Sequence, residues 1–564
     1  MEIEGGMTMD ERRKNFFTVD RRFRARLGRL LPADVLAWAK PRFVEMGDLA
    51  ANFFDPRAAL ADRFSPTLRT HDRHGNRIDR VEYHPAYLEM ARRAYEFGLV
   101  SMRYDSELAR RFGYLPYVVI FGLGYVLSQA EAGLYCPICM TDGAARVLVK
   151  FADPALRDKW LPRLTSRDFD ALAQGAMFLT EKQGGSDVGA NTTKAVADGD
   201  RWRLYGDKWF CSNVDADVIL ALARPEGAPP GTRGLGLFLV PRTLDDGRRN
   251  AYCIHRLKDK LGVRSMATGE VTFEGAEAYV IGDVGRGFTY MTEMINLSRL
   301  YNAVASIGSM RRSVYEAVAH AKEREAFGRR IIEFPLLRRV LADLIAEHEA
   351  AMALVFETIR QLDLVDSGAG SEDAAVQHRL LLPLSKYYTA RLAVWAASQA
   401  MEILGGNGYI EEFVTPRLLR DAQVLPIWEG TTNILVLDAR RAMIKEEAHL
   451  GLIEATRRRL EALHHSDLQD LRGPVEAHLT KLLDDLIPFL DGQTEALFAG
   501  QAITDRLIRV TQASLLLDEA QQNPDEIPVA RYFVQKHMTG MLDSKAADSI
   551  IRAESESLDG EVGD

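Results

Sequence analysis

A glutamate in the segment PIWEGTTNI (residues 426–434) has neighbours unlike those of an ordinary charged helix surface. Glu429 lies between Trp428 and Gly430, just before a run of hydroxyl and amide side chains. A carboxylate shielded from water can act as a general base near neutral pH, because lost solvation raises its pKa. An isolated glutamate of this kind is more often an exposed loop residue. Features elsewhere in the sequence are needed to choose between a general base and an exposed loop residue.

A second polar segment, FLTEKQGGSDVGANTTKA (residues 178–195), combines glycines with hydroxyl side chains. The pair Gly184-Gly185 lets a ligand approach the backbone closely. Thr180 and Ser186 beside it can bond an anion or a flavin ring. The segment alone is equally compatible with a polar hairpin loop.

Cys136 and Cys139, in CPIC, have the spacing of half a zinc site or of a redox pair. No second C-x-x-C or His pair accompanies them, and structural zinc takes four ligands. We therefore expect two thiols packed between helices and no metal. The sequence also lacks a complete G-x-G-x-x-G after a strand, a P-loop and an H-E-x-x-H motif, so nothing supports a Rossmann dinucleotide site.

The composition is that of a folded protein with more than one domain: 564 residues, 47% hydrophobic and 27% charged. Four cysteines favour a reducing compartment, and the N-terminus has no apolar signal region. We therefore predict a cytoplasmic protein. The longest apolar run, Tyr114 to Leu127, is short for a membrane span and predicts a buried helix.

The hydrophobic period changes twice along the chain, which predicts an α+β multidomain fold. Residues 1–170 are helical, with a break near Arg69–Pro85. Residues 171–285 form short strands, beginning with a hairpin around Asp198-Gly199. Residues 286–445 are helical again, and residues 446–564 form a further helical extension.

Within residues 286–445 we predict three long helices. Tyr290 to Gly328 contains no proline and keeps an apolar stripe, so we expect one continuous helix. A second helix runs from about Pro335 to Asp366, and the third ends at the pair Gly405-Gly406.

Five segments occur in a fixed order: residues 178–195, WFCSN (209–213), EREAFG (323–328), LGGNGY (404–409) and IWEGTTNI (427–434). Together they closely resemble the signature set of the acyl-CoA dehydrogenase family, over about residues 85–445. The resemblance implies an N-terminal helical domain, a central β-barrel and a C-terminal four-helix bundle. It also implies a homotetramer built from dimers, FAD bound across the dimer interface, and electron-transfer flavoprotein as the electron acceptor.

The resemblance assigns one group of residues to the flavin of the same subunit. Thr180 and Ser186 match positions that bond the flavin and its phosphates, and Gly185 gives close approach. Phe210 takes the place of an aromatic residue on the flavin face, and Ser212 that of a hydroxyl near N5.

A second group matches contacts to the neighbouring subunit's FAD. Arg324 and Phe327 match residues that reach its pyrophosphate and adenine, and Gly405 and Gly406 match glycines that pass it. The family commonly has Gln three positions before this glycine pair, and here the residue is Glu402.

The resemblance answers the question raised by Glu429, which matches the catalytic base. Thr431 and Asn433 match contacts to the far portion of the cofactor. The implied reaction is α,β-dehydrogenation, in which the thioester carbonyl is bonded by the ribityl hydroxyl and by the N–H of Glu429. The base removes the α-proton while the β-hydride moves to flavin N5. Some family members place the base on the long helix, where Glu293 is the alternative.

The acyl-CoA substrate is assigned to Arg299, Ser186, Trp428 and Gly430 by the same resemblance. Two positions differ from many family members: Trp428 replaces a tyrosine, and Asn296 replaces an aspartate that helps to hold the CoA adenine. The placement of CoA therefore rests on fewer matches than the placement of FAD.

Features outside the common core resemble the alkylation-response (AidB-type) branch, including Glu402, residues 74–87 and the extension. Three classes of function remain. The first two are an FAD enzyme acting on acyl-CoA and a flavoprotein that binds DNA or lipid with little turnover. The third is an acyl-CoA oxidase.

The charge of the extension bears on the DNA-binding alternative. Residues 441–564 hold 13 basic and 23 acidic residues, a net charge of 13 − 23 = −10. Phosphate binding requires the opposite sign, so we predict no DNA binding by the extension.

Overall fold

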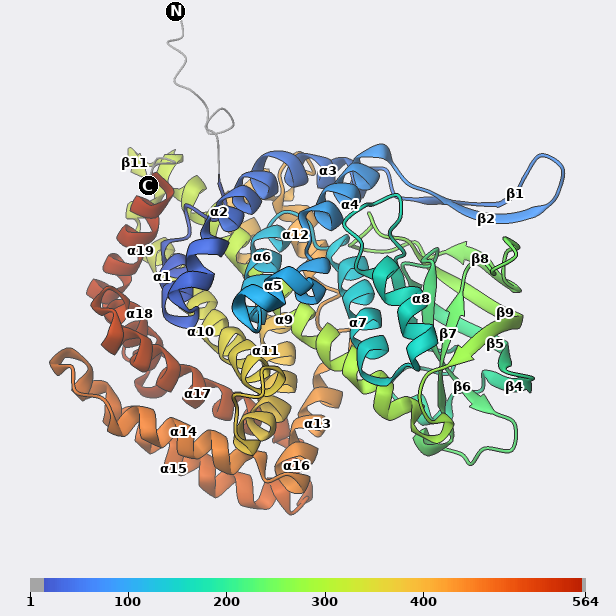
Figure 1. Cartoon of the computed structure of the whole chain (residues 1–564). Coiled ribbons are helices and arrows are strands. Elements are labelled where there is room, and N and C mark those ends of the chain that lie inside the picture. The colour runs from blue at the N-terminus through green and yellow to red at the C-terminus, as the bar shows by residue number, and fades with distance from the viewer. Residues whose placement is uncertain (1–14, 560–564) are drawn as a thin grey trace, which may run out of the picture.

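The computed structural model describes residues 15–559, which form helical, sheet and helical parts in chain order (Figure 1). The N-terminal helices are α1 (Arg21–Leu30), α2 (Ala33–Leu49), α3 (Asp55–Arg63), α4 (Pro85–Phe97), α5 (Ser106–Phe112), α6 (Tyr117–Ser128), α7 (Tyr135–Phe151) and α8 (Pro154–Leu164). Every residue of α6 is buried, which confirms the prediction of a buried apolar helix. No helix within residues 15–559 is long and apolar enough to cross a membrane.

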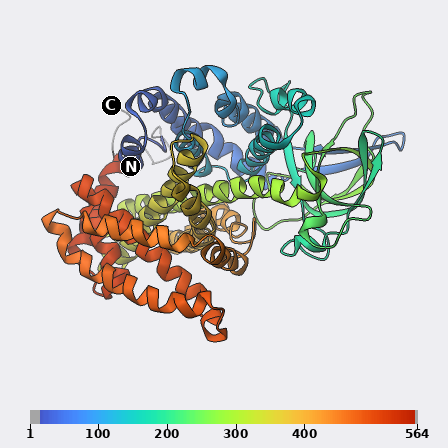
Figure 2. The same ribbon diagram turned by 60° about the horizontal axis from the view of Figure 1, so that its bottom comes forward.

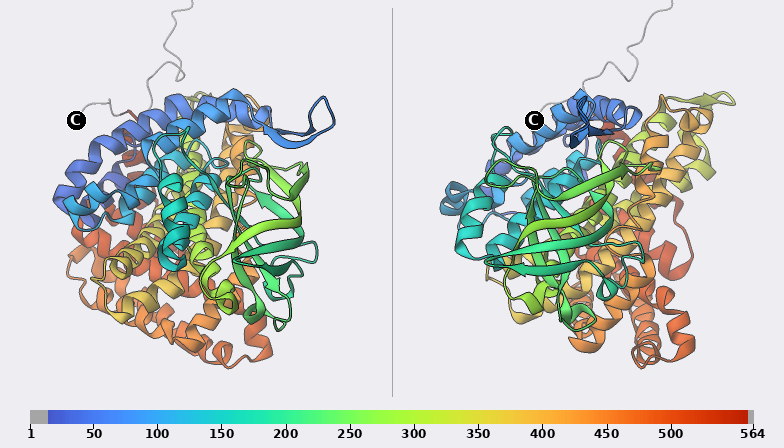
Figure 3. Two further views of the ribbon diagram at one scale, coloured as in Figure 1. Left: turned by 45° about the vertical axis from the view of Figure 1, so that its right-hand side comes forward. Right: turned by 90° about the vertical axis from the view of Figure 1, so that its right-hand side faces the viewer.

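The break predicted near Arg69–Pro85 is an antiparallel hairpin rather than a simple turn. Strands β1 (Thr67–His71) and β2 (Arg77–Glu82) pair with each other and project away from the helices (Figures 1 and 3). Gly75 closes the hairpin with φ +82°, a conformation that glycine adopts without steric cost.

The central domain is a seven-stranded sheet. Its strands are β3 (Gly175–Phe178), β4 (Lys194–Asp198), β5 (Arg201–Ser212), β6 (Val218–Pro225), β7 (Gly236–Pro241), β8 (Tyr252–Leu257) and β9 (Thr268–Val280). The order is β3-β6-β4-β5-β9-β7, and β8 pairs with β9 beside this path. Strand β7 also pairs with β6, so the path closes on itself as in a barrel. The predicted hairpin is present, with Asp198 opposite Arg201 in the β4–β5 pair.

The helices within residues 286–445 are α9 (Gly287–Glu323), α10 (Pro335–Asp366), α11 (Glu372–Leu404), α12 (Thr415–Ala422) and α13 (Thr432–Lys445). The first of them is shorter than predicted. It ends at Glu323, and the chain enters a two-residue hairpin, β10 (Glu325–Ala326) and β11 (Arg329–Arg330). Phe327 and Gly328 have φ +53° and +78°, so the helical conformation cannot continue through them.

The extension is helical as predicted and lies against the bundle, at the opposite side of the molecule from the sheet (Figures 1 and 2). Its helices are α14 (Ala448–Glu461), α15 (Gln469–Leu490), α16 (Thr494–Phe498), α17 (Gly500–Gln522), α18 (Ile527–Val534) and α19 (Ser544–Asp559). Both α17 and α19 contact α10, so the extension covers a face of the bundle.

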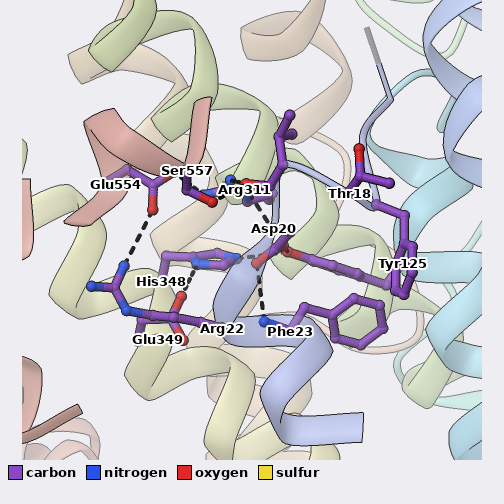
Figure 4. A network of polar contacts seen from close by, with 12 residues as sticks. Thr18, Asp20, Arg22, Phe23, Tyr125, Arg311, His348, Glu349, Glu554 and Ser557 are labelled. Atoms are coloured by element: carbon purple, nitrogen blue, oxygen red, sulfur yellow. Dashed lines mark hydrogen bonds and ion pairs between the residues drawn. The ribbon is translucent and has the colours of Figure 1, made fainter. Parts of the chain in front are cut away.

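A buried network of charges attaches the last helix to the N-terminal segment (Figure 4). Glu554 of α19 accepts from Arg22 of α1 and from Arg311 of α9. Arg311 also contacts Asp20, which accepts from the hydroxyl of Tyr125 at 2.6 Å. The N-terminal segment, α6, α9 and α19 therefore share one desolvated network.

Candidate active site

The turn that carries Glu429 has a backbone conformation that is unfavourable for a glutamate. It joins α12 to α13, and Glu429 has φ +57° while Gly430 has φ +104°. Residues with side chains rarely adopt positive φ, and such strain persists only where the surroundings enforce it. The contacts of this turn therefore have to supply the stabilisation.

Two basic side chains hold this turn from different helices. Arg299 of α9 donates through Nε to the backbone oxygen of Glu429 at 3.2 Å. Lys386 of α11 donates through Nζ to the backbone oxygen of Gly430 at 2.7 Å. Arg299 also pairs with Asp438 of α13 at 2.8 Å, which ties the turn to the helix that follows it.

The electrostatic surroundings of Glu429 suit a base. Burial raises the pKa of Glu429 above its ordinary range, and a hydrogen bond from Ser298 together with the charges of Arg299 and Lys386 opposes that rise. A carboxylate with a raised pKa is a better proton acceptor, while the two cations still favour its ionised form.

The C-x-x-C pair lies close to this turn. Both thiols are on α7, with Cys139 buried and Cys136 half-buried. Burial raises the pKa of Cys136 to about 12, and the charge of Glu429 contributes to the rise. These thiols therefore stay protonated at neutral pH. Within residues 15–559, no group of three or more His, Cys, Asp or Glu side chains could hold a metal ion.

The first group of predicted flavin residues lies on one edge of the sheet domain. The backbone N–H of Trp209 donates to the backbone oxygen of Thr180 at 2.9 Å, which brings the glycine-rich segment beside β5. Gly185 and Ser186 are exposed, Ser212 is half-buried, and the ring of Phe210 is 58% exposed.

These residues have the chemistry that a flavin requires. Phe210 offers an exposed aromatic face beside the hydroxyls of Thr180 and Ser212. A side chain at Gly185 would place its Cβ 2.5 Å from the hydroxyl oxygen of Thr180 and would crowd that hydroxyl. An FAD ring with its phosphates fits this combination of aromatic, hydroxyl and glycine residues.

Sequence reasoning missed the residue that shapes this edge. Glu181 is 2% exposed and accepts from Lys208 at 2.8 Å and from the backbone and hydroxyl groups of Thr192 and Thr193. Burial alone would raise the pKa of Glu181, but Lys208 and these donors lower it to about 2. Glu181 follows Thr180 directly, so this buried ion pair fixes the start of the glycine-rich loop.

A loop after β8 connects the sheet edge to the Glu429 turn. Its Lys258 lies over the Trp209 ring, 3.3 Å from the ring centroid. Farther along, the backbone N–H of Val263 donates to Asp421 of α12 at 2.6 Å. Because α12 leads into the turn, the two halves of the predicted site are joined through residues 258–263.

The second predicted group lies elsewhere. Arg324 follows the end of α9, 25 residues after Arg299, which corresponds to roughly 37 Å along a helix. Arg324, Glu402, Gly405 and Gly406 are exposed. The ring of Phe327 is 96% exposed. Arg324 is therefore remote from the residue that holds the Glu429 turn of its own copy.

The remaining predicted residues surround Glu429 in the chain. Trp428 and Gly430 are half-buried, and Thr431 and Asn433 are exposed at the start of α13. A cavity of about 470 Å³ lies at the base of the β1–β2 hairpin, lined by Tyr83, Tyr87, Phe169, Asp215 and Asp217 among others. None of the predicted site residues lines this cavity.

Comparison with known proteins agrees with this architecture along the whole chain. Three domain families match in order: the adaptive response protein AidB N-terminal domain over residues 8–171, the acyl-CoA dehydrogenase middle domain over 176–276 and the acyl-CoA dehydrogenase C-terminal domain over 285–444. The chain belongs to the acyl-CoA dehydrogenase family. The family prediction made from the five motifs is confirmed, and so is the likeness to the AidB branch.

Two relatives are similar over most of their length. Acyl-CoA dehydrogenase family member 11 of Caenorhabditis elegans is 33% identical over 558 residues, which cover 94% of this chain and 89% of the relative. The putative acyl-CoA dehydrogenase AidB of Escherichia coli is 36% identical over 404 residues, covering 70% and 72%. The crystal structure of C. elegans ACDH-11 in complex with C11-CoA superimposes with a TM-score of 0.88 at 30% identity, covering 100% of this chain and 98% of that one. The family likeness therefore includes the extension.

Proposed function

We propose that the protein is an FAD-dependent acyl-CoA dehydrogenase that oxidises the α,β bond of an acyl-CoA thioester with Glu429 as the base. The observation that carries the proposal is the Glu429 turn, in which a carboxylate with a raised pKa is held at positive φ by Arg299 and Lys386. A strained turn secured by two helices is an arrangement expected of a functional site.

In this reaction Glu429 accepts the α-proton of the thioester. Gly430 adopts φ +104°, which a side chain would disfavour, and Arg299 keeps the turn from relaxing. When bound, FAD supplies the hydride-accepting chemistry. The residues that would hold it are Thr180, Gly185, Ser186, Phe210 and Ser212 on the sheet edge. Trp428, Ser186 and Arg299 remain the proposed substrate contacts, and electron-transfer flavoprotein is the proposed acceptor.

A second copy of the chain completes the proposed cofactor site. Arg324 lies roughly 37 Å along α9 from Arg299, and Glu402 lies roughly 24 Å along α11 from Lys386, the two residues that hold the Glu429 turn. The members of this group, Arg324, Phe327, Glu402, Gly405 and Gly406, are exposed. A guanidinium can bond a pyrophosphate through two parallel hydrogen bonds. We therefore assign this group, with Thr431 and Asn433, to FAD shared between subunits of a dimer of dimers.

A second candidate is a flavoprotein of the alkylation response that binds DNA or lipid with little turnover. The match of residues 8–171 to the AidB N-terminal domain favours it. The net charge of −10 in residues 441–564 argues against DNA as the ligand of the extension, because phosphate contacts require basic groups.

One experiment separates these candidates. The FAD-loaded protein is mixed without oxygen with acyl-CoA thioesters of graded chain length, including C11-CoA, and the flavin absorbance is followed. Bleaching within seconds supports the dehydrogenase. An unchanged spectrum with every thioester would favour the flavoprotein that binds DNA or lipid with little turnover. Rapid peroxide formation in air would indicate an oxidase.

A further inference from the structure

Lys386 is a buried cation on a helix whose neighbouring residues are also buried. It lies on α11 with no exposed surface, between the buried residues Leu382 and Ala390. Its Nζ donates to the backbone oxygen of Gly430 at 2.7 Å. In the part of the chain that the structure describes, no carboxylate oxygen forms an ion pair with this ammonium within 4.0 Å.

A buried ammonium with a single carbonyl partner is costly, because two of its N–H groups lose their water. A leucine of similar volume would avoid that cost. Burial lowers the pKa of Lys386 to about 7, the charge of Glu429 counteracts this lowering, and Arg299 adds to it. The favourable electrostatic partner of the ammonium is therefore the carboxylate of Glu429, one residue before the carbonyl that it binds.

We propose that Lys386 is a positioning residue that acts on Glu429 in two ways: its hydrogen bond holds the Glu429–Gly430 turn, and its positive charge keeps the carboxylate ionised. This inference rests on the proposed role of Glu429 as the base and names a residue that the motifs do not contain. The two contributions can be separated, because glutamine retains a hydrogen-bond donor without the charge.

The charged and titratable groups that face Glu429 come from four elements. Arg299 projects from α9, Lys386 from α11, and the thiols Cys136 and Cys139 from α7. Asp438 of α13 is bound by Arg299 at 2.8 Å and by Arg379 at 2.6 Å, so its charge is compensated. Lys260, which acts electrostatically on Cys136, lies beyond the thiols. Of Arg299 and Lys386, the two cations that act on Glu429, Arg299 is paired with Asp438 and Lys386 has no carboxylate partner within residues 15–559.

The sign of the effect follows from these charges. A cation near a carboxylate lowers the pKa of the carboxyl group, so removal of the Lys386 charge must raise the pKa of Glu429. The rate of proton removal falls on the acid side of that pKa. Loss of the charge should therefore move the acid limb of the rate profile to higher pH, by about one unit for one nearby charge.

The test compares Lys386→Gln and Lys386→Met in the FAD-loaded protein, with flavin reduction by C11-CoA measured against pH. We expect the acid limb to move up by about one unit in both variants. We expect the limiting rate at high pH to fall about tenfold or more in Lys386→Met and by less in Lys386→Gln, which can still donate to Gly430. Lys536→Gln is the control, because it removes a lysine charge beside a different buried carboxylate, Glu347, elsewhere in the fold. Its acid limb should not move.

A second measurement does not depend on turnover. The pH dependence of the stability difference between the wild type and Glu429→Gln reports the titration of Glu429, and the same difference is measured in the Lys386→Gln background. We expect the titration to shift to higher pH when Lys386 is replaced. An unshifted titration and an unshifted acid limb would overturn the proposal. If no acyl-CoA reduced the wild-type protein, the proposed function would be contradicted. The comparison of stabilities against pH would still test the effect of Lys386 on Glu429.

Discussion

Arg299 and Glu429 are joined across two elements of the bundle: the guanidinium of Arg299 donates to the backbone oxygen of Glu429 at 3.2 Å and pairs with Asp438 at 2.8 Å. Arg379 holds the other carboxylate oxygen of Asp438 at 2.6 Å. The resemblance assigns Arg299 to the substrate, and these contacts give it a positioning role as well. The turn depends on this bond because Glu429 has φ +57°.

The first prediction concerns Arg299→Gln. We expect the rate of flavin reduction by acyl-CoA to fall about 10²-fold, since a small displacement of a reacting group costs that much, while FAD content stays near wild type. Stopped-flow absorbance measures the rate. Arg379→Gln is the control: it removes one partner of Asp438 but leaves the bond to Glu429, so its rate should fall much less. Equal rates in wild type and Arg299→Gln would contradict the positioning role.

The second prediction is that Glu429→Gln loses roughly 10²–10⁴ in the rate of flavin reduction, the usual contribution of a positioned base. The wild-type rate should rise with pH through the raised pKa of Glu429, because only the carboxylate accepts a proton. Glu293→Gln is the control. Its carboxylate binds Arg146 at 3.1 Å and Lys150 at 2.8 Å, so it is poorly placed to act as a base. A large loss in Glu293→Gln alone would reverse the assignment.

The bounds of a helix could be predicted from the sequence where proline, glycine and the hydrophobic period all indicate the same ends. The helix predicted from Pro335 to Asp366 has those bounds in the structure, because proline begins it and the glycine-containing segment after Asp366 ends it. The helix predicted from Tyr290 to Gly328 was too long at its C-terminal end. Its hydrophobic period gives no warning of the turn at Phe327, where positive φ depends on the hairpin that follows.

The site was predictable only as far as its motifs reach. Glu429 and the residues predicted to bind the flavin stand in recognisable segments. Glu181 lies in one of these segments without a predicted role, and Lys386 lies in none of them. Both are buried by elements far away in the chain: Glu181 pairs with Lys208 and Lys386 bonds Gly430. Burial of this kind depends on tertiary packing, which periodicity cannot give.

The third prediction concerns shared FAD. Arg324→Ala should lower both the FAD retained after dialysis and the mass of the assembly in light scattering, because the exposed guanidinium is proposed to bond the pyrophosphate of FAD in a second copy. Arg330→Ala, on the adjacent hairpin strand β11, is the control and should retain both. A monomeric Arg324→Ala with full flavin content, or an unchanged oligomer with full flavin content, would refute the shared site.

The fourth prediction is a pH dependence of stability. Glu347 accepts from His537 at 2.7 Å and from Lys536 at 2.8 Å. Burial alone would raise the pKa of Glu347, but these partners lower it to about 2. Since the folded value lies below the unfolded one, Glu347 stabilises the fold by about 3 kcal/mol above pH 5 and loses this as pH falls from about 4.5 to about 2.

Thermal unfolding across this pH range tests the point. The stability gap between wild type and Glu347→Gln should be constant above about pH 5 and close at lower pH. Glu461→Gln, an exposed residue of α14, is the control and should show little gap at any pH. A gap that persists unchanged to the lowest pH would mean that packing, and not the charge of Glu347, is responsible.

The last prediction concerns the buried network that attaches the extension. Glu554 joins Arg22 and Arg311, both at most 6% exposed, from two other parts of the chain. Glu554→Gln removes the carboxylate that these two guanidiniums share, while Arg22 keeps Glu526 and Arg311 keeps Asp20. The substitution should therefore destabilise the protein by up to about 3 kcal/mol. Hydrogen exchange of residues 544–559 should rise, because α19 loses its buried ion pairs to α1 and α9. Asp548→Asn is the control on the same helix: its pair with Arg338 is solvent-exposed and should contribute less than about 1 kcal/mol. If exchange in α19 rose equally in both variants, surface charge and not the buried network would hold the extension in place.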